Sequence, residues 1–127
     1  MNQVRVVGIV SSAVLAALGD EGQGYVAGEE IFLGDTNIEH MKTDHLEDYL
    51  KYQYRLPQIL AEPDYVGIND VDGSLEYVKV FSEHVKLAVR VAGNDKLYVR
   101  SMYVVKKSRT DYFIKSGRLK PLTTGNK

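Results

Sequence analysis

The string LEYVKVFSEHVKLAVRVAGNDKLYVRSMYVV, residues 75–105, alternates apolar and polar side chains and is interrupted by short polar turns. Alternation with a period of two is typical of β-strands, whose successive side chains point to opposite faces. It predicts strands at 75–81, 85–91 and 97–105, with a further strand before them at 65–68. Because the connections are short, we expect these strands to be consecutive antiparallel neighbours.

Helical spacing and turn residues predict the other elements. Helices that precede a meander are typical of an α+β domain with its helices on one face of the sheet. No internal repeat or long linker divides the chain. We therefore expect residues 1–127 to form a single domain, in which a four-stranded antiparallel sheet packs against N-terminal helices. The expected helices are 13–18, 38–54, 57–61 and 108–116, and the additional expected strands are 4–10, 25–27 and 31–33.

Charge is divided unevenly along the chain. Residues 1–78 hold 14 acidic and 4 basic side chains, a net charge of −10, and residues 79–127 hold 12 basic and 3 acidic ones, a net charge of +9. A basic C-terminal half indicates a phosphate-bearing partner such as nucleic acid. In the alternative interpretation the two halves neutralise each other across one fold, in agreement with the whole-chain net charge of −1.

The composition excludes several classes of protein. There are no cysteines, so catalysis by a thiol and zinc binding by cysteine are excluded. An apolar content of 44% and a charged content of 26% are typical of a globular protein rather than a disordered one. The longest apolar stretch, residues 6–18, is shorter than a membrane span of about 20 residues and lacks the basic start of a signal peptide. We therefore expect a cytoplasmic protein without a membrane partner.

Two histidines share the predicted helix at 38–54. His40 and His45 are five residues apart, so their rings would lie about 140° apart around an ideal helix. This spacing differs from the i, i+4 pair of a helical zinc motif, and no phosphate-binding glycine motif is present, so we expect neither a metal nor another cofactor. Because imidazole titrates near neutral pH, either histidine is a candidate general acid or base. The alternative is that His45 packs within the fold and His40 is solvated.

Residues 97–107, LYVRSMYVVKK, combine strand alternation with basic and hydroxyl side chains. Strict alternation predicts that Ser101 and Tyr103 share one face of the strand and that Arg100 lies on the other. A sheet surface of this kind can hold phosphodiester oxygens and stabilise the charge of a cleavage transition state without a metal. The alternative is an ordinary half-exposed sheet surface. The residues expected to bind nucleic acid are Lys79, Arg90, Lys106 and Lys107.

Three segments, taken in order, resemble a known family. They are TNIEHMKTDH at 36–45, ILAEPDY at 59–65 and RSMY at 100–103. Together they resemble the phage-borne nuclease domains of the BECR superfamily, which is named after barnase, EndoU, colicin and RelE. The resemblance covers residues 31–119, which would form the core of the domain, and it leaves residues 1–30 as an N-terminal strand–helix extension.

The resemblance implies a barnase/RelE-like fold and a toxin-like, metal-independent endoribonuclease from a phage or mobile element. Such enzymes assist attack of the RNA 2′-OH on the adjacent phosphate and leave a cyclic phosphate. The implied partners are RNA, with tRNA as one candidate, and a protein inhibitor or another phage protein. One alternative is a non-catalytic module that keeps the fold and binds nucleic acid or protein, and another is a metal hydrolase built on His40 and Asp44. Carried over by position, the catalytic candidates are His40, His45, Arg100, Ser101 and Tyr103. Of the two histidines, we expect His40 to be the base, because it lies near the N-terminus of the predicted helix, where the helix dipole favours a neutral imidazole.

Overall fold

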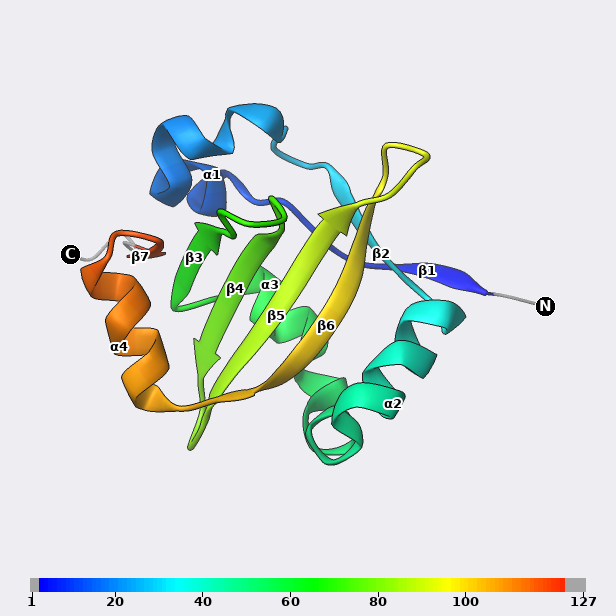
Figure 1. Cartoon of the computed structure of the whole chain (residues 1–127). Coiled ribbons are helices and arrows are strands. Elements are labelled where there is room, and N and C mark those ends of the chain that lie inside the picture. The colour runs from blue at the N-terminus through cyan, green and yellow to red at the C-terminus, as the bar shows by residue number, and fades with distance from the viewer. Residues whose placement is uncertain (1–2, 123–127) are drawn as a thin grey trace.

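The computed structural model describes residues 3–122, which form one sheet of seven strands with helices beside it (Figure 1). The strand order across the sheet is β1-β2-β6-β5-β4-β3-β7. The ends of the predicted domain, residues 1–2 and 123–127, lie outside the described residues. The strands are β1 (Val4–Ile9), β2 (Glu30–Gly34), β3 (Tyr65–Ile68), β4 (Leu75–Val80), β5 (His84–Val91), β6 (Leu97–Val105) and β7 (Leu119–Pro121). The helices are α1 (Ser12–Leu18), α2 (Asp35–Tyr52), α3 (Leu56–Ala61) and α4 (Lys107–Lys115), with 3-10 helices η1 (Gly19–Gly24) and η2 (Gln53–Arg55).

The predicted meander is confirmed. β3, β4, β5 and β6 are consecutive antiparallel neighbours, and their bounds agree with the expected ones to within one residue. Helix α2, which carries His40 and His45, packs along β6. The turn between β5 and β6 is closed by a hydrogen bond of 2.8 Å from the Ala92 N–H to the Lys96 carbonyl oxygen. Alternation and tight turns are local features, which is why the sequence predicts them well.

The expected sheet of four antiparallel strands is wrong, because strands are added at both edges of the meander. β2 pairs in parallel with β6 through Ile31 to Leu97 and Phe32 to Tyr98, and β1 pairs antiparallel with β2. At the other edge, β7 pairs antiparallel with β3. These additions cover backbone groups that the outer strands of the meander would otherwise expose. Their partners are distant in the chain, so a local pattern does not predict the pairing.

The predictions for the N-terminal region are partly confirmed. Ser11 caps α1 by accepting a hydrogen bond of 3.1 Å from the Val14 N–H, and Gly19, with a φ of 60°, follows the last helical residue. The strand expected at 25–27 is wrong, because these residues lie in a loop and turn, and β2 begins only at Glu30.

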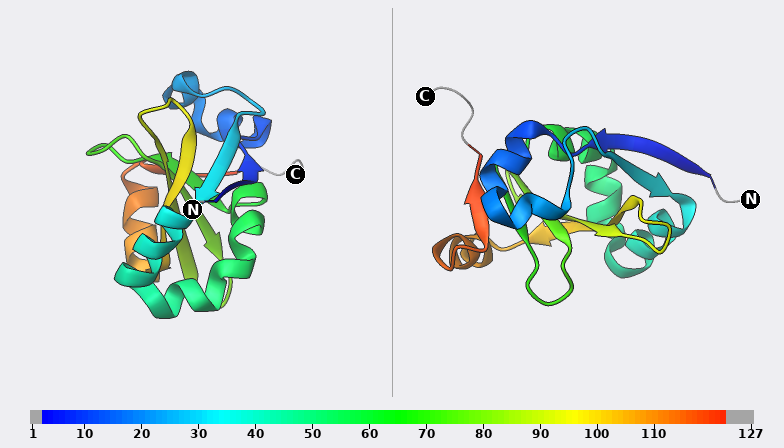
Figure 2. Two further views of the ribbon diagram at one scale, coloured as in Figure 1. Left: turned by 90° about the vertical axis from the view of Figure 1, so that its right-hand side faces the viewer. Right: turned by 90° about the horizontal axis from the view of Figure 1, so that it is seen from above.

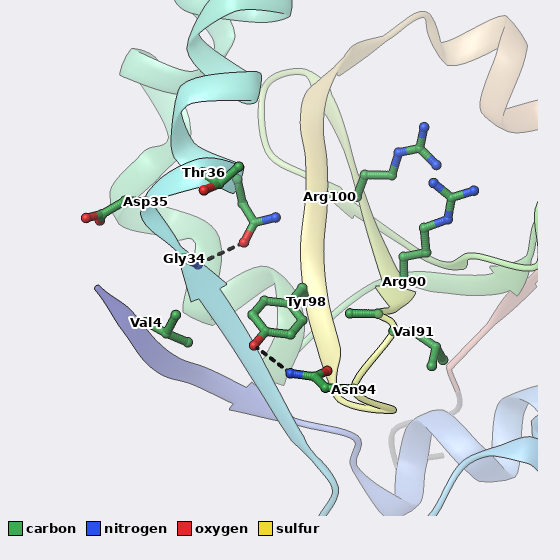
Figure 3. Close-up of a pocket in the computed structure, with 12 residues that line it drawn as sticks. Val4, Gly34, Asp35, Thr36, Arg90, Val91, Asn94, Tyr98 and Arg100 are labelled. Carbon is green, nitrogen blue, oxygen red and sulfur yellow. Dashed lines mark hydrogen bonds between the residues drawn. The ribbon is translucent and has the colours of Figure 1, made fainter. Parts of the chain in front are cut away.

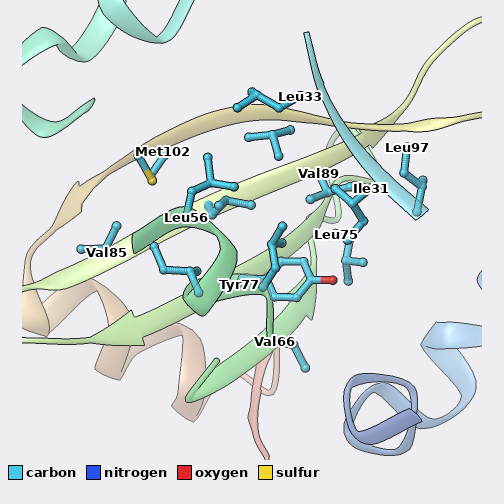
Figure 4. Packing of buried hydrophobic residues seen from close by; sticks show 14 of the residues in the cluster. Ile31, Leu33, Leu56, Val66, Leu75, Tyr77, Val85, Val89, Leu97 and Met102 are labelled. Atoms are coloured by element: carbon cyan, nitrogen blue, oxygen red, sulfur yellow. The ribbon is translucent and has the colours of Figure 1, made fainter. Parts of the chain in front are cut away.

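The two faces of the sheet differ in what covers them. On one face, α1 and α3 pack over buried side chains of the strands, among them Leu75, Tyr77 and Val85 (Figure 4). The opposite face has α2 and α4 at its two sides (Figure 2). We call it the open face, and cross-strand pairing places on it Glu76, Lys86, Ala88, Ser101 and Tyr103.

A β-bulge in β6 corrects the predicted distribution of its side chains. Val89 pairs with Val99 and Ala88 pairs with Ser101, which leaves Arg100 as an extra residue in β6. Beyond this point Met102, which is fully buried, takes the place in the core that strict alternation assigns to Ser101. The bulge therefore gathers Arg100 with Ser101 at the open face, and the expected separation of these two residues is wrong.

A glycine allows β7 to approach β3 closely. Gly67 of β3 pairs with Leu119, and a Cβ atom at position 67 would overlap the carbonyl oxygen of Arg118. This contact involves backbone rather than a flexible side chain, so it could be relieved only by moving the strand. Gly67 thus determines where Arg118 meets the sheet.

We predict that Gly67→Ala lowers the free energy of unfolding by about 2 kcal/mol, the range typical of an overpacked interior. Gly24→Ala is the matched control, because a Cβ atom there would have no neighbour within 4 Å. Urea denaturation of both variants measures the difference. Equal stability of the two variants would contradict the close approach of β7.

Candidate functional site

The open face contains a cleft of about 240 Å³. Its residues come from β4, β5, β6 and the connection between β3 and β4. Three of the predicted site residues, all on β6, meet in this cleft. The residues that line it are Asn69, Asp72, Ser74, Glu76, Lys86, Ala88, Arg100, Ser101 and Tyr103.

The most buried charge in the cleft is the carboxylate of Glu76, of which 2% is exposed. Lys86 Nζ lies 2.7 Å from Glu76 Oε2. Arg118 donates a hydrogen bond from Nε to Oε1 at 3.0 Å and another from Nη2 to Oε2 at 2.9 Å. Burial opposes ionisation of Glu76, but the hydrogen bonds from Arg118 and Lys86 outweigh burial and hold the pKa of Glu76 below its ordinary value.

Aromatic rings lie against both of these cations. The Arg118 guanidinium is 4.2 Å from the centroid of the Phe113 ring in α4. Lys86 Nζ is 5.9 Å from the Phe113 centroid and 6.0 Å from the Tyr103 centroid. Arg118 directs two N–H donors to Glu76. The ammonium of Lys86 has three N–H donors and contacts one oxygen of the Glu76 carboxylate. Lys86 therefore keeps donors for an anion that enters the cleft.

Arg100 is the more accessible cation of the cleft. Its side chain is 48% exposed, and its Nη1 lies 3.4 Å from Asp72 Oδ2, a long contact. The side chain of Arg90 extends beside that of Arg100 (Figure 3). Hydrogen bonds from Ser74, and then the charges of Arg90 and Arg100, lower the pKa of the Asp72 carboxyl. One carboxylate thus lies near two guanidinium groups, which leaves positive charge available to a ligand.

The structure separates the two helix histidines. The ring of His45 stacks on the ring of Tyr103, with centroids 4.5 Å apart and planes inclined by 15°, and so reaches the edge of the cleft. The backbone of His45 is non-helical (φ −146°, ψ 60°) and kinks α2, so the angle expected for an ideal helix does not apply. His40 is exposed, and within residues 3–122 its ring makes no stacking contact and no hydrogen bond.

The four residues expected to bind nucleic acid lie on different surfaces. Arg90 is beside the cleft. Lys79 pairs across the strands with Val85 of the core, which places it on the face opposite the cleft. Lys106 lines a separate hollow of about 450 Å³ at the start of α4, where Lys107 forms an ion pair of 2.8 Å with Asp111.

Glu76 and Lys86 line the cleft, and Arg118 binds Glu76 from beside it. These three residues lie outside the predictions made from sequence. Glu76 and Lys86 do carry a signal, because they are charged residues within largely apolar strands and buried charges need partners. Arg118 carries none, since its position depends on β7, whose three residues are too few for a strand pattern.

Within residues 3–122, no group of three or more His, Cys, Asp or Glu side chains is arranged to hold a metal ion. In the same part of the chain, none of the helices has the length and apolar character needed to cross a membrane. The two carboxylates of the cleft, Asp72 and Glu76, are both engaged by basic side chains.

The family suspected from sequence is confirmed by comparison with known proteins. The model of a family described as phage-Barnase-EndoU-ColicinE5/D-RelE like nuclease3 matches residues 5–112. The matched part includes His45, Glu76, Lys86 and Arg100 and ends before Arg118. No curated protein and no solved structure matches the chain.

We predict that Glu76→Gln lowers the free energy of unfolding by roughly 3 kcal/mol at pH 7, because it leaves the charges of Lys86 and Arg118 without their partner. The folded-state pKa of Glu76 is lowered, so its contribution is present above the ordinary value of 4.5 and is lost as pH falls through the lowered pKa. The difference between the wild-type protein and the variant should therefore shrink below about pH 4.5.

Glu83→Gln is the matched control for this experiment. Glu83 is paired with Lys51, but the side chains are 39% and 58% exposed, so its loss should affect stability far less. Urea denaturation between pH 3 and pH 7 measures both variants. If the difference in the free energy of unfolding between the wild-type protein and Glu76→Gln did not change with pH, the ion pairs of Glu76 would not be its source.

Proposed function

This chain belongs to the family of phage BECR-like nucleases, and we propose that it is a metal-independent endoribonuclease. Membership of a nuclease family implies a nucleic-acid substrate. The observation that carries the proposal is the cleft that brings Lys86, Arg100 and the stacked pair of His45 and Tyr103 together. Such cations can hold a phosphate group, and an imidazole beside them can transfer a proton.

In the proposed reaction, Lys86 and Arg100 bind the scissile phosphate of RNA. His45 accepts the proton of the 2′-OH, and the 2′-oxygen forms a bond to phosphorus. The bond from phosphorus to the 5′-oxygen breaks, and the leaving oxygen takes a proton from solvent. The products are a 2′,3′-cyclic phosphate and a 5′-OH. Ser101 and Tyr103 orient the substrate, Ser101 through its hydroxyl and Tyr103 by holding the His45 ring.

RNA suits this cleft because its own 2′-OH supplies the nucleophile. The protein then has to provide a proton acceptor and compensation for the charge that develops on the phosphate oxygens. Four cations, Lys86, Arg90, Arg100 and Arg118, lie in or beside the cleft with three carboxylates, Asp70, Asp72 and Glu76. This excess of positive charge supports an anionic substrate.

Glu76 acts as a positioning residue in this proposal. It accepts hydrogen bonds from both Lys86 and Arg118, and a carboxylate with a lowered pKa is a weak proton acceptor. Its contribution is to hold the Lys86 ammonium where the phosphate binds.

The test of the proposed function is incubation of total RNA and of purified tRNA with the protein in excess EDTA. We expect cleavage that resists the chelator, fragments that end in a 2′,3′-cyclic phosphate, and no cleavage of an oligonucleotide whose riboses are 2′-O-methylated. Cleavage that needs a divalent ion would contradict the mechanism. Binding of RNA without cleavage would favour a non-catalytic nucleic-acid-binding module.

We predict that His45→Ala lowers kcat/KM for RNA by about 10²- to 10⁴-fold, the usual contribution of general acid–base catalysis. His40→Ala is the matched control on the same helix and should retain activity near that of the wild type. Both side chains are exposed, so thermal denaturation should show little change in either variant. Similar activities of the two variants would exclude His45 as the proton acceptor.

A further inference from the structure

A second and larger hollow adjoins the cleft. It has a volume of about 520 Å³, within the range of pockets that hold small ligands. It lies between the turn that joins β5 to β6 and the start of α2, and it shares Arg100 with the cleft. The two cavities therefore meet at one guanidinium group on the open face.

The side chains of this hollow are of the kinds that bind nucleotides. Arg90 and Arg100 extend side by side along one border, and the Tyr98 ring lies across β6 from them, toward β2 (Figure 3). Asn94, in the turn, donates a hydrogen bond of 3.3 Å to the Tyr98 hydroxyl. The acidic residue of the lining, Asp35, points away from the arginines, and its carboxylate accepts a hydrogen bond of 3.0 Å from the Gln3 N–H.

We infer that this hollow binds the nucleoside adjacent to the dinucleotide unit held in the cleft, with the connecting phosphate on Arg90. The inference rests on the proposed function, since it assumes that a scissile phosphate occupies the cleft. The Tyr98 ring, whose centroid is 5.7 Å from that of Phe32, offers aromatic surface to a base. The Asn94 amide oxygen accepts a hydrogen bond of 3.0 Å from the Lys96 N–H, and the amide keeps a second lone pair and a second hydrogen for a base edge. Arg90 forms no ion pair within residues 3–122 and is available to a phosphate.

Because the hollow adjoins the cleft, the affinity for RNA should depend on the length of the RNA. A dinucleotide would fill only the cleft, whereas a tetranucleotide would also reach the hollow, whichever direction its strand runs. One additional stacked base and one additional phosphate contact should strengthen binding by about ten-fold or more.

Binding of 2′-O-methyl RNA of random sequence, as dinucleotides and as tetranucleotides, tests the inference. The 2′-O-methyl group prevents cleavage, so titration calorimetry at one salt concentration reports binding alone. In the wild-type protein, tetranucleotides should bind about ten-fold more tightly than dinucleotides. In the variants Arg90→Gln and Asn94→Asp, most of this gain in affinity from dinucleotide to tetranucleotide should be lost.

Lys96→Gln is the matched control. It makes the same change of charge as Arg90→Gln next to the same turn, but Lys96 does not line the hollow. This variant should keep the ten-fold gain. Equal losses of the gain in Arg90→Gln and Lys96→Gln, or a wild-type protein that binds both lengths equally, would overturn the inference.

The two proposals fail in different ways. Chelator-resistant cleavage by a protein that shows no gain with length would leave the proposed function intact and remove the second nucleoside site. A clear gain with length in a protein that does not cleave RNA would keep the site and remove the endoribonuclease activity.

Discussion

A carboxylate that is almost fully buried must be neutralised, and this requirement at Glu76 organises the open face of the sheet. Lys86 comes from the neighbouring strand, whereas Arg118 comes from the turn that follows α4, so the ion pairs join β4, β5 and the last part of the described chain. Phe113 lies against the Arg118 guanidinium and holds α4 at the side of the cleft. The close approach at Gly67 sets the position of Arg118 along the sheet. One buried charge thereby specifies how three separate segments meet.

Two irregularities of the backbone bring the remaining side chains to the same place. The bulge in β6 turns Ser101 toward the open face beside Arg100, and it places Met102 in the core. Bulges of this kind are frequent near functional sites, because an extra residue redirects a side chain without disrupting the rest of the strand. The kink of α2 at His45 places its ring on Tyr103. Beyond the kink, Asp48 accepts a hydrogen bond of 3.0 Å from the Val104 N–H, which ties the second half of α2 to β6 where the parallel pairing with β2 has ended.

The uneven distribution of charge agrees with both interpretations of it, neutralisation within the fold and a basic surface for a phosphate-bearing partner. Much of the asymmetry is neutralised inside the fold, because most ion pairs join a residue of the acidic half to one of the basic half. Within residues 3–122, the cations of the basic half that form no ion pair are spread over several surfaces, and of these Arg90 lies beside the cleft. The cations without an ion pair are Lys79, Arg90, Lys96, Lys106, Arg109 and Lys115. The ion pairs that join the two halves are Lys51–Glu83, Lys86–Glu76, Arg100–Asp72, Arg118–Asp70, Arg118–Glu76 and Lys120–Glu21.

The amino-acid sequence alone was enough for the family, the central meander and the helix that carries both histidines, because alternation, turn residues and short motifs act over a few neighbouring positions. It also identified Arg100, Ser101 and Tyr103 as a group, although strict alternation assigned Ser101 and Tyr103 to the core face. Only the tertiary structure decided the edge pairing of β2 and β7, the partners of Glu76, and which histidine reaches the cleft. Each of these depends on segments that are far apart in the chain and meet only when the whole sheet has formed, so no local pattern of residues encodes them.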